Sequence, residues 1–330
     1  MNGRETSDNR YYNRIEYKLN LMPEYATEWY YHLRANRMKA STCYNYINKL
    51  YQLLFFIDWS RTSEIKTEEL TPQIIEKYII SLQSIKEDGK IRKSSDAYQA
   101  NTWSCLNNFF EFLNKREYTE KNIIEKAGLE KPRVRDEVKR IHLTKKDFSK
   151  IIKTVSYGKE EDPIRCRDTA ILLLFMTTGM RKMALDSINI SDLNLSSSIL
   201  DTIEVVDKGE RKHEYELTDQ TRQALLDWLE MRPLLAGGYD DDALFISYQG
   251  LRLSGNSIYK IVKKWTKEAL GIELSPHKLR GGFITIMIDE TGDIAATSEA
   301  VGHKNVSTTQ RYYASVGRGK KLAAKVMGDI

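Results

Sequence analysis

The sequence predicts a mainly α-helical protein, in which an all-α helical-bundle domain precedes an α+β domain with a small antiparallel β-sheet. Three observations predict this class. Apolar residues recur at helical spacing along most of the chain. Only residues 199–206 and 213–217 have the composition of β-strands. A basic stretch with a proline divides the chain, and 330 residues suit two domains better than one.

The first half is predicted to begin with a polar tail, residues 1–19, and to continue as an all-helical domain over residues 20–130. In one expected helix the apolar residues recur every three or four positions: Tyr46, Leu50, Leu53, Leu54 and Ile57. Thr71 and Pro72 provide the N-cap and the first-turn proline of the next helix. The expected helices span residues 22–36, 41–60, 71–84, 95–115 and 120–127.

Two segments of this half lack a helical pattern. Asp88-Gly89-Lys90 predicts a polar loop. Residues 131–140, K-P-R-V-R-D-E-V-K-R, combine five basic residues with one proline and no apolar stripe, so we expect an extended linker.

The second half is predicted to fold as one domain over residues 141–315, followed by a tail at 316–330. Its first helix has a capping box, formed by Thr144 and Asp147. The two predicted strands are joined by a turn that contains Lys208. Further helices are expected at residues 165–177, 219–231, 254–270, 276–291, 294–301 and 307–315.

The composition excludes several protein classes. No run approaches the roughly 18 apolar residues of a membrane span, and the polar segment from Met1 to Arg14 lacks the apolar core of a signal peptide. Cys43, Cys105 and Cys166 are odd in number and far apart, so we expect reduced thiols in a cytoplasmic protein and no zinc site. The net charge is only +5, so any DNA-binding surface must come from local patterning.

Six polar residues in the second half suit one reaction, the attack on a phosphodiester without a metal ion. They are Arg181, Lys208, His277, Arg280, His303 and Tyr312. Guanidinium groups neutralise the charge on phosphate oxygens. Imidazole and ammonium groups move protons, and a tyrosine oxygen is a nucleophile.

His277 and Arg280 are three residues apart on one expected helix, so they share a face. Ser275 is a suitable N-cap and Pro276 a suitable first residue, which puts His277 in the first turn. The N-terminal end of a helix favours an anion. The other interpretation of this segment is simple helix capping with solvated side chains.

The strings T-T-G-M-R, S-P-H-K-L-R and V-G-H-K-N-V-S-T-T-Q-R-Y give the order Arg…Lys…His-x-x-Arg…Gly-His…Tyr. This order resembles the tyrosine recombinases, the phage integrase family, and in particular its Xer-like members. The resemblance implies that Tyr312 attacks a phosphodiester, forms a 3′-phosphotyrosine and frees a 5′-hydroxyl. It implies that Lys208 protonates the leaving oxygen, with Lys212 as a competing candidate. Tyr313 is adjacent, but the spacing of nine from His303 (312 − 303) selects Tyr312.

One position departs from the family pattern. The family usually has a glutamate or aspartate three residues after the first arginine, where this chain has Ala184. Asp186 is a possible substitute, although two residues further along a helix it points elsewhere. We expect this departure to affect the speed of catalysis more than the type of reaction.

The resemblance also implies partners and an organisation. The substrate is double-stranded DNA, no metal or cofactor is needed, and four protomers assemble on paired sites, with a monomer or weak self-association when free. Residues 20–130 resemble the core-DNA-binding (SAM-like) domain, residues 131–140 cross the DNA as a strap, and residues 316–330 pack on a neighbouring protomer. Integration, excision or inversion of a mobile element is the expected role, with accessory DNA-bending or directionality proteins as possible partners.

Residues expected to contact the DNA backbone are basic or polar and lie at the start of the second helix, in the linker and on the helix at 254–270. They are Lys39, Ser41, Thr42, Tyr44, Asn45, Arg133, Arg135, Lys260, Lys263 and Lys264. Three other interpretations of the chain stay open. They are a type IB topoisomerase, a catalytically silent or impaired DNA-binding protein derived from recombinases, and a helical scaffold without a DNA role.

Overall fold

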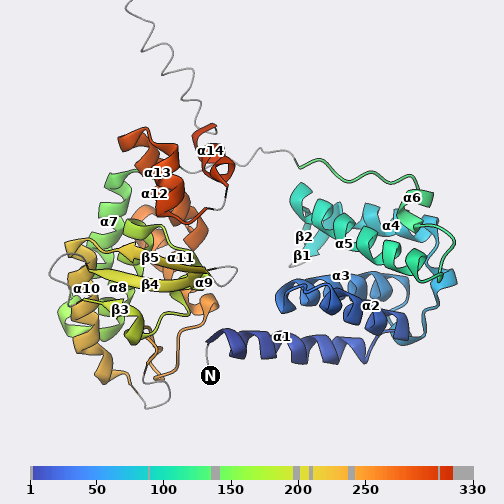
Figure 1. Ribbon diagram of the computed structural model, residues 1–330, viewed down its shortest axis with the longest axis horizontal. Coiled ribbons are helices and arrows are strands. Elements are labelled where there is room, and N and C mark those ends of the chain that lie inside the picture. The colour runs from blue at the N-terminus through green and yellow to red at the C-terminus, as the bar shows by residue number, and fades with distance from the viewer. Residues whose placement is uncertain are drawn as a thin grey trace, which may run out of the picture. The chain divides into compact units, whose positions relative to one another are not determined.

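The computed structural model describes residues 3–87, 90–134, 142–195, 201–207, 211–236, 242–303 and 305–314. The chain forms two compact units, Met1–Val138 and Lys139–Ile330 (Figure 1). The structure confirms the predicted fold class, because both units are mainly helical and the second contains a three-stranded antiparallel sheet.

The first unit is a bundle of helices around an aromatic core. Trp29, Phe109 and Phe110 are fully buried, and the rings of Trp29 and Phe109 meet edge-on at 5.0 Å between centroids. The Trp29 indole also donates a hydrogen bond to Asn108, which leaves no unpaired donor at this point in the core. The helices are α1 Gly3–Leu19, α2 Glu24–Ala35, α3 Ala40–Ile57, α4 Pro72–Ser81, α5 Asp96–Lys115 and α6 Ile123–Lys126, with 3-10 turns η1 Thr62–Glu64 and η2 Thr67–Glu69.

The structure differs from the sequence prediction at two places in this unit. Residues 3–19 form helix α1 and not a polar tail, because Ile15 is buried in the core and Lys18 packs over the Tyr51 ring. The segment predicted as a polar loop contains strands β1 Ser84–Glu87 and β2 Lys90–Lys93, paired antiparallel. The Asp-Gly pair between these strands is a strong hairpin signal that the prediction did not use.

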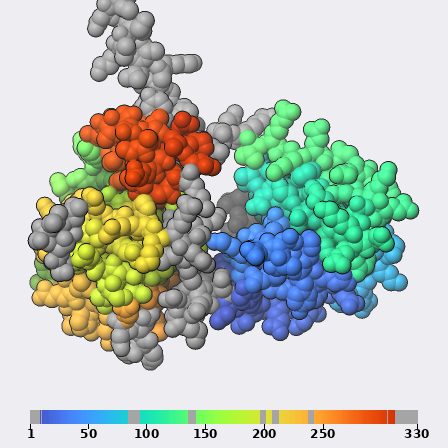
Figure 2. Space-filling view, in the orientation of Figure 1, coloured from blue at the N-terminus to red at the C-terminus, as the bar shows by residue number. Residues whose placement is uncertain are grey.

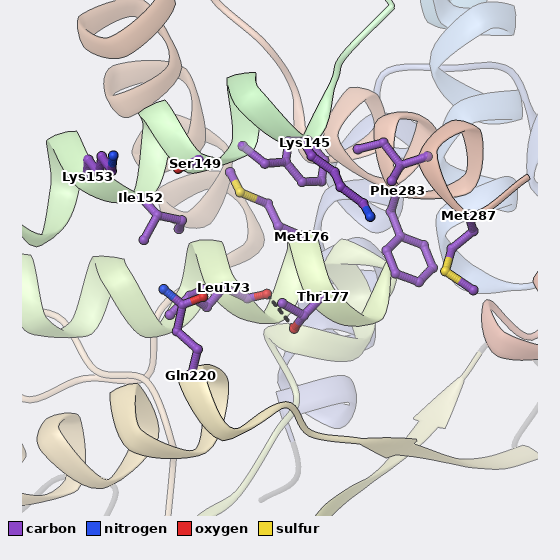
Figure 3. A pocket seen from close by; sticks show the side chains of 12 residues that line it. Lys145, Ser149, Ile152, Lys153, Leu173, Met176, Thr177, Gln220, Phe283 and Met287 are labelled. Carbon is purple, nitrogen blue, oxygen red and sulfur yellow. Dashed lines mark hydrogen bonds between the residues drawn. The ribbon is translucent and has the colours of Figure 1, made fainter. Parts of the chain in front are cut away.

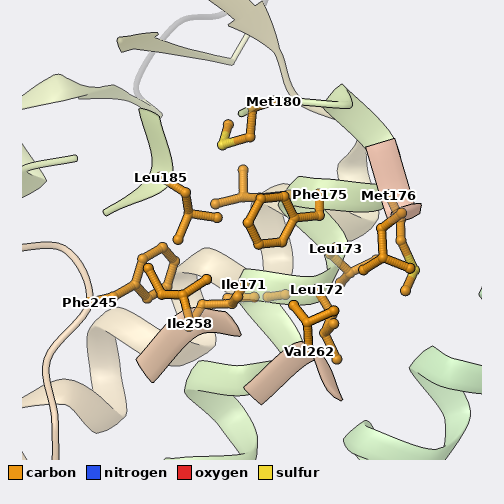
Figure 4. Packing of buried hydrophobic residues seen from close by; sticks show 14 of the residues in the cluster. Ile171, Leu172, Leu173, Phe175, Met176, Met180, Leu185, Phe245, Ile258 and Val262 are labelled. Atoms are coloured by element: carbon orange, nitrogen blue, oxygen red, sulfur yellow. The ribbon is translucent and has the colours of Figure 1, made fainter. Parts of the chain in front are cut away.

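The second unit is built around helix α8. Its residues are buried almost throughout, and it packs against α7, α10 and α12. Figure 4 shows Leu172 beside Val262 of α11 and Phe175 directed toward Leu185. The helices are α7 Lys145–Ser156, α8 Pro163–Thr178, α9 Lys182–Leu185, α10 Asp219–Met231, α11 Gly255–Leu270, α12 Pro276–Thr291, α13 Ile294–Ala300 and α14 Val306–Ala314, with 3-10 turns η3 Lys159–Glu161, η4 Ile190–Asp192 and η5 Arg232–Leu234.

The sheet of the second unit has the strand order β3-β4-β5, with β3 Leu193–Asn194, β4 Thr202–Asp207 and β5 Arg211–Glu216. Val205 pairs with His213 and Ile203 with Tyr215, so these two β5 residues lie on one face of the sheet. Figure 2 shows α12, α13 and α14, coloured red, gathered as one block at one end of this unit, with the yellow strands below them.

Local signals in the sequence explain where the helices of the second unit begin and end. The Thr144–Asp147 capping box is present, and Ser275 caps α12 by accepting a hydrogen bond from the Lys278 amide. Helix α8 ends at Gly179, whose φ of 63° favours glycine. A Cβ at this position would lie 2.4 Å from the Phe283 ring, so a larger residue cannot be accommodated without movement of the Phe283 side chain.

The three cysteines are free and buried. Burial raises the pKa of Cys105 to about 12 and that of Cys166 to about 11, so both thiols stay protonated and unreactive at neutral pH. Within the described ranges, no three His, Cys, Asp or Glu side chains form a group that could hold a metal ion. No helix in the described part of the chain is both long and apolar enough to cross a membrane.

Candidate active site

Arg280 is buried on α12 and held by main-chain carbonyls from two other elements. Its side chain is only 3% exposed. One terminal nitrogen donates to the Gly179 carbonyl at 2.6 Å and the other donates to the Val301 carbonyl at 2.9 Å. The end of α8 and the end of α13 therefore fix the orientation of this guanidinium.

Arg181 lies two residues beyond the glycine that ends α8, in extended backbone at the start of α9. It is half-buried, and its terminal nitrogen donates to the Gly302 carbonyl at 3.1 Å. Arg181 and Arg280 are thus bonded to consecutive carbonyls, although they are 99 residues apart in the chain (280 − 181).

His303 follows directly after these carbonyls. Its Nδ1 forms a hydrogen bond of 2.7 Å with the hydroxyl of Thr309, a fully buried residue of α14. Burial and, to a smaller extent, the charges of Arg280, Arg181 and His277 together lower the pKa of His303 to about 4. The imidazole is therefore neutral at pH 7, and it lies within electrostatic reach of both arginines.

His277 completes the group from the exposed first turn of α12. It lies three residues before Arg280 on the same helix, and its charge is one of those that lower the pKa of His303. The structure therefore brings together four of the six predicted residues from α8–α9, α12 and the end of α13. Two arginines and a helix N-terminus in one place form a site for an anion with several oxygens.

The other two predicted catalytic residues are described only in part or not at all. Lys208 lies outside the described residues, between the end of β4 and the start of β5. Tyr312 is on helix α14, as is Tyr313, and their side chains lie outside the described part. The backbone puts the two tyrosines three and four residues after Thr309, within one turn of the contact to His303. The competing candidate Lys212 is exposed and pairs with Glu204 at 2.8 Å, which raises its pKa.

Ala184 is buried on the short helix α9. The carboxylate of Asp186 lies close to Gly255 at the start of α11, since a Cβ on that glycine would be 2.6 Å from its oxygen. The same point is 3.1 Å from the Lys182 ammonium nitrogen, so the side chains of Asp186 and Lys182 both lie beside the start of α11. The carbonyls of Gly179, Val301 and Gly302 accept hydrogen bonds from the two arginines.

The residues predicted to contact DNA in the first unit lie at the beginning of α3. Lys39 precedes the helix, and Ser41, Thr42, Tyr44 and Asn45 occupy its first two turns, all exposed or half-buried. Tyr44 packs against Tyr11 of α1, with 5.6 Å between ring centroids. Helix α1 therefore contributes to the same surface, which the sequence did not indicate.

The remaining predicted contact residues differ in their surroundings. Arg133 is exposed, whereas Arg135 lies outside the described residues. Lys260 is exposed on α11. Lys263 pairs with Glu273 at 2.5 Å, and Lys264 packs over the Trp265 ring at 4.2 Å, so both ammonium groups already have partners within the protein.

An apolar pocket of about 500 Å³ opens elsewhere in this unit, between α7, α8 and α12. Figure 3 shows Phe283 and Met287 of α12 and Met176 of α8 among the side chains that line it. Arg181, His277, Arg280 and His303 do not line this pocket. It is thus separate from the cationic group.

Comparisons with known proteins identify the family of this chain. Residues 142–317 match the model of the family described as "Phage integrase family". Tyrosine recombinase XerC of Vibrio cholerae serotype O1 is 37% identical over 154 residues, 46% of this chain and 48% of that protein. XerC of Histophilus somni is 28% identical over 288 residues, 86% of this chain and 90% of the other. The match spans about half the length of the first curated relatives.

Solved structures show the same fold at low sequence identity. The XerH site-specific recombinase bound to a palindromic difH substrate matches with a TM-score of 0.64 and 19% identity, over 88% of this chain and 81% of that one. A lambda integrase dimer bound to a COC′ core site matches with a TM-score of 0.62 and 17% identity, over 86% of this chain and 95% of the other. From the matched domain and its cationic group, the chain belongs to the phage integrase family.

Proposed function

We propose that this chain is a site-specific DNA recombinase that cuts and rejoins double-stranded DNA through a phosphotyrosine intermediate. The observation that carries the proposal is the convergence of Arg181, Arg280 and His303, with His303 bonded to the helix that carries Tyr312. The relatives named above include recombinases bound to DNA, which supports the same class of substrate for this chain.

In the proposed reaction the Tyr312 oxygen attacks phosphorus and the bond to the 5′ oxygen breaks. Arg181 and Arg280 balance the charge that develops on the non-bridging oxygens. His277 and neutral His303 supply hydrogen bonds and proton transfer. Lys208 gives its proton to the departing 5′ oxygen. Because the phosphodiester energy stays in the phosphotyrosine, a 5′-hydroxyl of a second duplex reverses the step and joins new strands.

The proposed assembly is a homotetramer on two paired DNA sites, in which each protomer cuts one strand. A lambda integrase tetramer bound to a Holliday junction is among the structures with the same fold, and it supports this stoichiometry. Residues 20–130 would grip the duplex as a core-binding domain, and residues 131–140 would cross it. Residues 316–330, outside the described part, would pack on a neighbouring protomer. We place the reaction in the cytoplasm, for the integration, excision or inversion of a mobile element, with accessory proteins as further partners.

The test of this function is the capture of a covalent intermediate. The purified full chain is incubated with labelled, nicked duplexes that tile the DNA flanking its own gene, and the products are separated on a denaturing gel. A nick close to the cleavage point lets the short strand diffuse away, so that the covalent complex accumulates. We expect a shifted band that persists in Tyr313→Phe and is lost in Tyr312→Phe.

Other results would support the alternative functions. Binding of every fragment in a native gel without covalent capture would favour a silent DNA-binding protein. Relaxation of supercoils by a monomer, with no joining of two duplexes, would favour a type IB topoisomerase. A band that is lost only in Tyr313→Phe would mean that Tyr313, and not Tyr312, is the nucleophile.

A further inference from the structure

His213 is a fifth polar residue that touches this site, and it comes from the sheet. It lies on β5 opposite Val205 and is half-buried. Its Nε2 is 3.3 Å from the Ala300 carbonyl, and its ring lies edge-on to the Tyr215 ring at 4.4 Å between centroids. A Cβ on Gly302 would be 3.3 Å from His213 Nδ1, so the imidazole lies against the backbone of that residue.

Three consecutive carbonyls at the end of α13 therefore bond to side chains from three different elements. Ala300 is bonded to His213 of β5, Val301 to Arg280 of α12, and Gly302 to Arg181 after α8. Carbonyls in the last turn of a helix lack partners within that helix, so they are available for such bonds. The residue that follows directly is His303.

We propose that His213 is a positioning residue for the anion site, which holds the turn formed by Ala300, Val301 and Gly302 against the sheet. When this turn is fixed, the carbonyls that accept from Arg181 and Arg280 stay in place. The backbone of His303, the next residue, is fixed with them. Strand β5 begins three residues after Lys208. The bond between His213 and the Ala300 carbonyl therefore links the strand that follows Lys208 to the turn that holds the two arginines. The part of this proposal that concerns catalysis rests on the proposed recombinase function.

Tyr215 supports the His213 ring from the neighbouring position on the same face of β5. Its side chain is 4% exposed. Burial raises the pKa of its phenol, and the charges of Arg280 and Arg181 only partly oppose this. The phenol is therefore neutral at physiological pH, so it packs beside the arginines without cancelling their charge.

The first experiment tests the bond to Ala300 in the full chain without DNA. His213→Gln keeps an N–H donor near the position of Nε2, whereas His213→Leu keeps similar bulk without a donor. The imidazole signals of labelled protein are followed by NMR as the pH is lowered, with His32 of the first unit as an internal reference. In the wild type and His213→Gln we expect His303 to titrate near the same low pH. In His213→Leu the turn loosens and water reaches His303, so its proton affinity should rise at least tenfold.

Two outcomes would overturn the positioning role. One is that the two variants give the same His303 titration, whether altered or not. The other is that His213→Leu moves the His32 signal or lowers the melting temperature as much as a core substitution, which would mean general unfolding. Tyr215→Phe is the packing control, and it should leave the His303 titration unchanged.

The second experiment measures covalent capture of a nicked duplex at several DNA concentrations. His213→Leu should lower the maximal rate about tenfold with little change in the half-saturating concentration, because binding contacts are kept and the reacting geometry is loosened. His213→Gln should restore most of the rate. Equal rates for the leucine variant and the wild type would contradict the catalytic part. If the wild type captures no duplex, the recombinase function fails, whereas the NMR titration still decides whether His213 holds the turn.

Discussion

Arg167, Arg232 and Arg280 are the buried arginines in the described part of the second unit, and two of them, Arg167 and Arg280, are held in different ways. Arg167 of α8 is 5% exposed, and its guanidinium is bonded to the Asp168 carboxylate at 2.7 Å and to the Ile246 carbonyl at 2.9 Å. Asp168 also accepts from the Trp265 indole. Arg280 is 3% exposed and is bonded to the carbonyls of Gly179 and Val301.

The acceptors of Arg167 and Arg280 differ in charge, although a carbonyl acceptor alone does not mark a site, because the buried Arg232 also donates to the carbonyl of Ala243. A carboxylate cancels the charge it bonds to, whereas a carbonyl orients a guanidinium and leaves the positive charge in place. The charge of Arg280 still acts on its neighbours, because it contributes to the low pKa of His303. Carbonyl acceptors therefore suit a guanidinium that has to attract a phosphate.

Loss of the core arginine should have the largest effect on stability. Arg167→Met leaves the Asp168 carboxylate buried with only the Trp265 indole as a partner among the bonds described above. Removal of one member of a buried ion pair typically costs about 3–5 kcal/mol. We expect a loss of that size in the free energy of unfolding, measured with chemical denaturant. The double variant Arg167→Met/Asp168→Asn should recover part of it, and no recovery would contradict the pairing.

Loss of the site arginine should act mainly on the reaction. Arg280→Met removes one charge from the anion site, and removal of a single such group typically lowers a rate by about a hundredfold to a thousandfold. The rate of covalent capture at saturating DNA is the measurement. Arg280→Lys, which keeps the charge but cannot bond to both carbonyls, should fall in between. If the lysine variant matches the wild type, orientation by the carbonyls is unimportant.

Substitution of Gly179, whose carbonyl accepts from Arg280, should have a smaller effect on stability than loss of Arg167. Gly179→Ala introduces a Cβ at a φ of 63° and 2.4 Å from the Phe283 ring, so strain and overpacking should together cost about 2 kcal/mol or more. Gly271 ends α11 with a φ of 75° and open space around it, so Gly271→Ala should cost only about 1 kcal/mol. Thermal unfolding of the two variants measures the difference, and equal losses would mean that the Phe283 contact is relaxed by a small shift.

The last prediction concerns the dependence of stability on pH. The folded-state pKa of His303 is about 4, below its ordinary value of 6.5, so the unfolded chain takes up this proton first as the pH falls. This contribution therefore favours folding fully above pH 6.5 and is lost between 6.5 and 4. In His303→Gln the melting temperature should fall less over this interval than in the wild type. Parallel curves for the two proteins would show that His303 titrates normally.

The sequence predicted those parts of the fold that depend on local signals. The Thr144 capping box, the Ser275 cap with Pro276 and the glycine that ends α8 all lie within a few residues of the structure they determine. Helix α1 was not predicted, because its sequence is polar and only the burial of Ile15 against distant residues reveals its inner face.

The candidate site was predictable in its residue types and only partly in its geometry. The spacing of His277 and Arg280 predicted a common face, and both residues lie at the anion site. The bonds from Arg181, Arg280 and His213 to the end of α13 had no sequence signal, since a carbonyl acceptor is present at every residue. The only sequence signal for His213 is the alternation of side-chain direction along β5. This alternation puts His213 on the same face of the sheet as the buried Tyr215.

The carbonyl acceptors of the turn also affect how substitutions should be tolerated in evolution. An acceptor that belongs to the main chain is kept when a side chain is exchanged, so the half-buried Ala300 can vary among residues that preserve the backbone path. Val301 is more restricted, because its side chain is buried in a cluster with Phe283 and Ile288. Gly302, with its φ of 64°, is the position where that path restricts the choice. In relatives of this chain we therefore expect the backbone path of this turn, with its carbonyl acceptors, to be retained, while the side chains on it change.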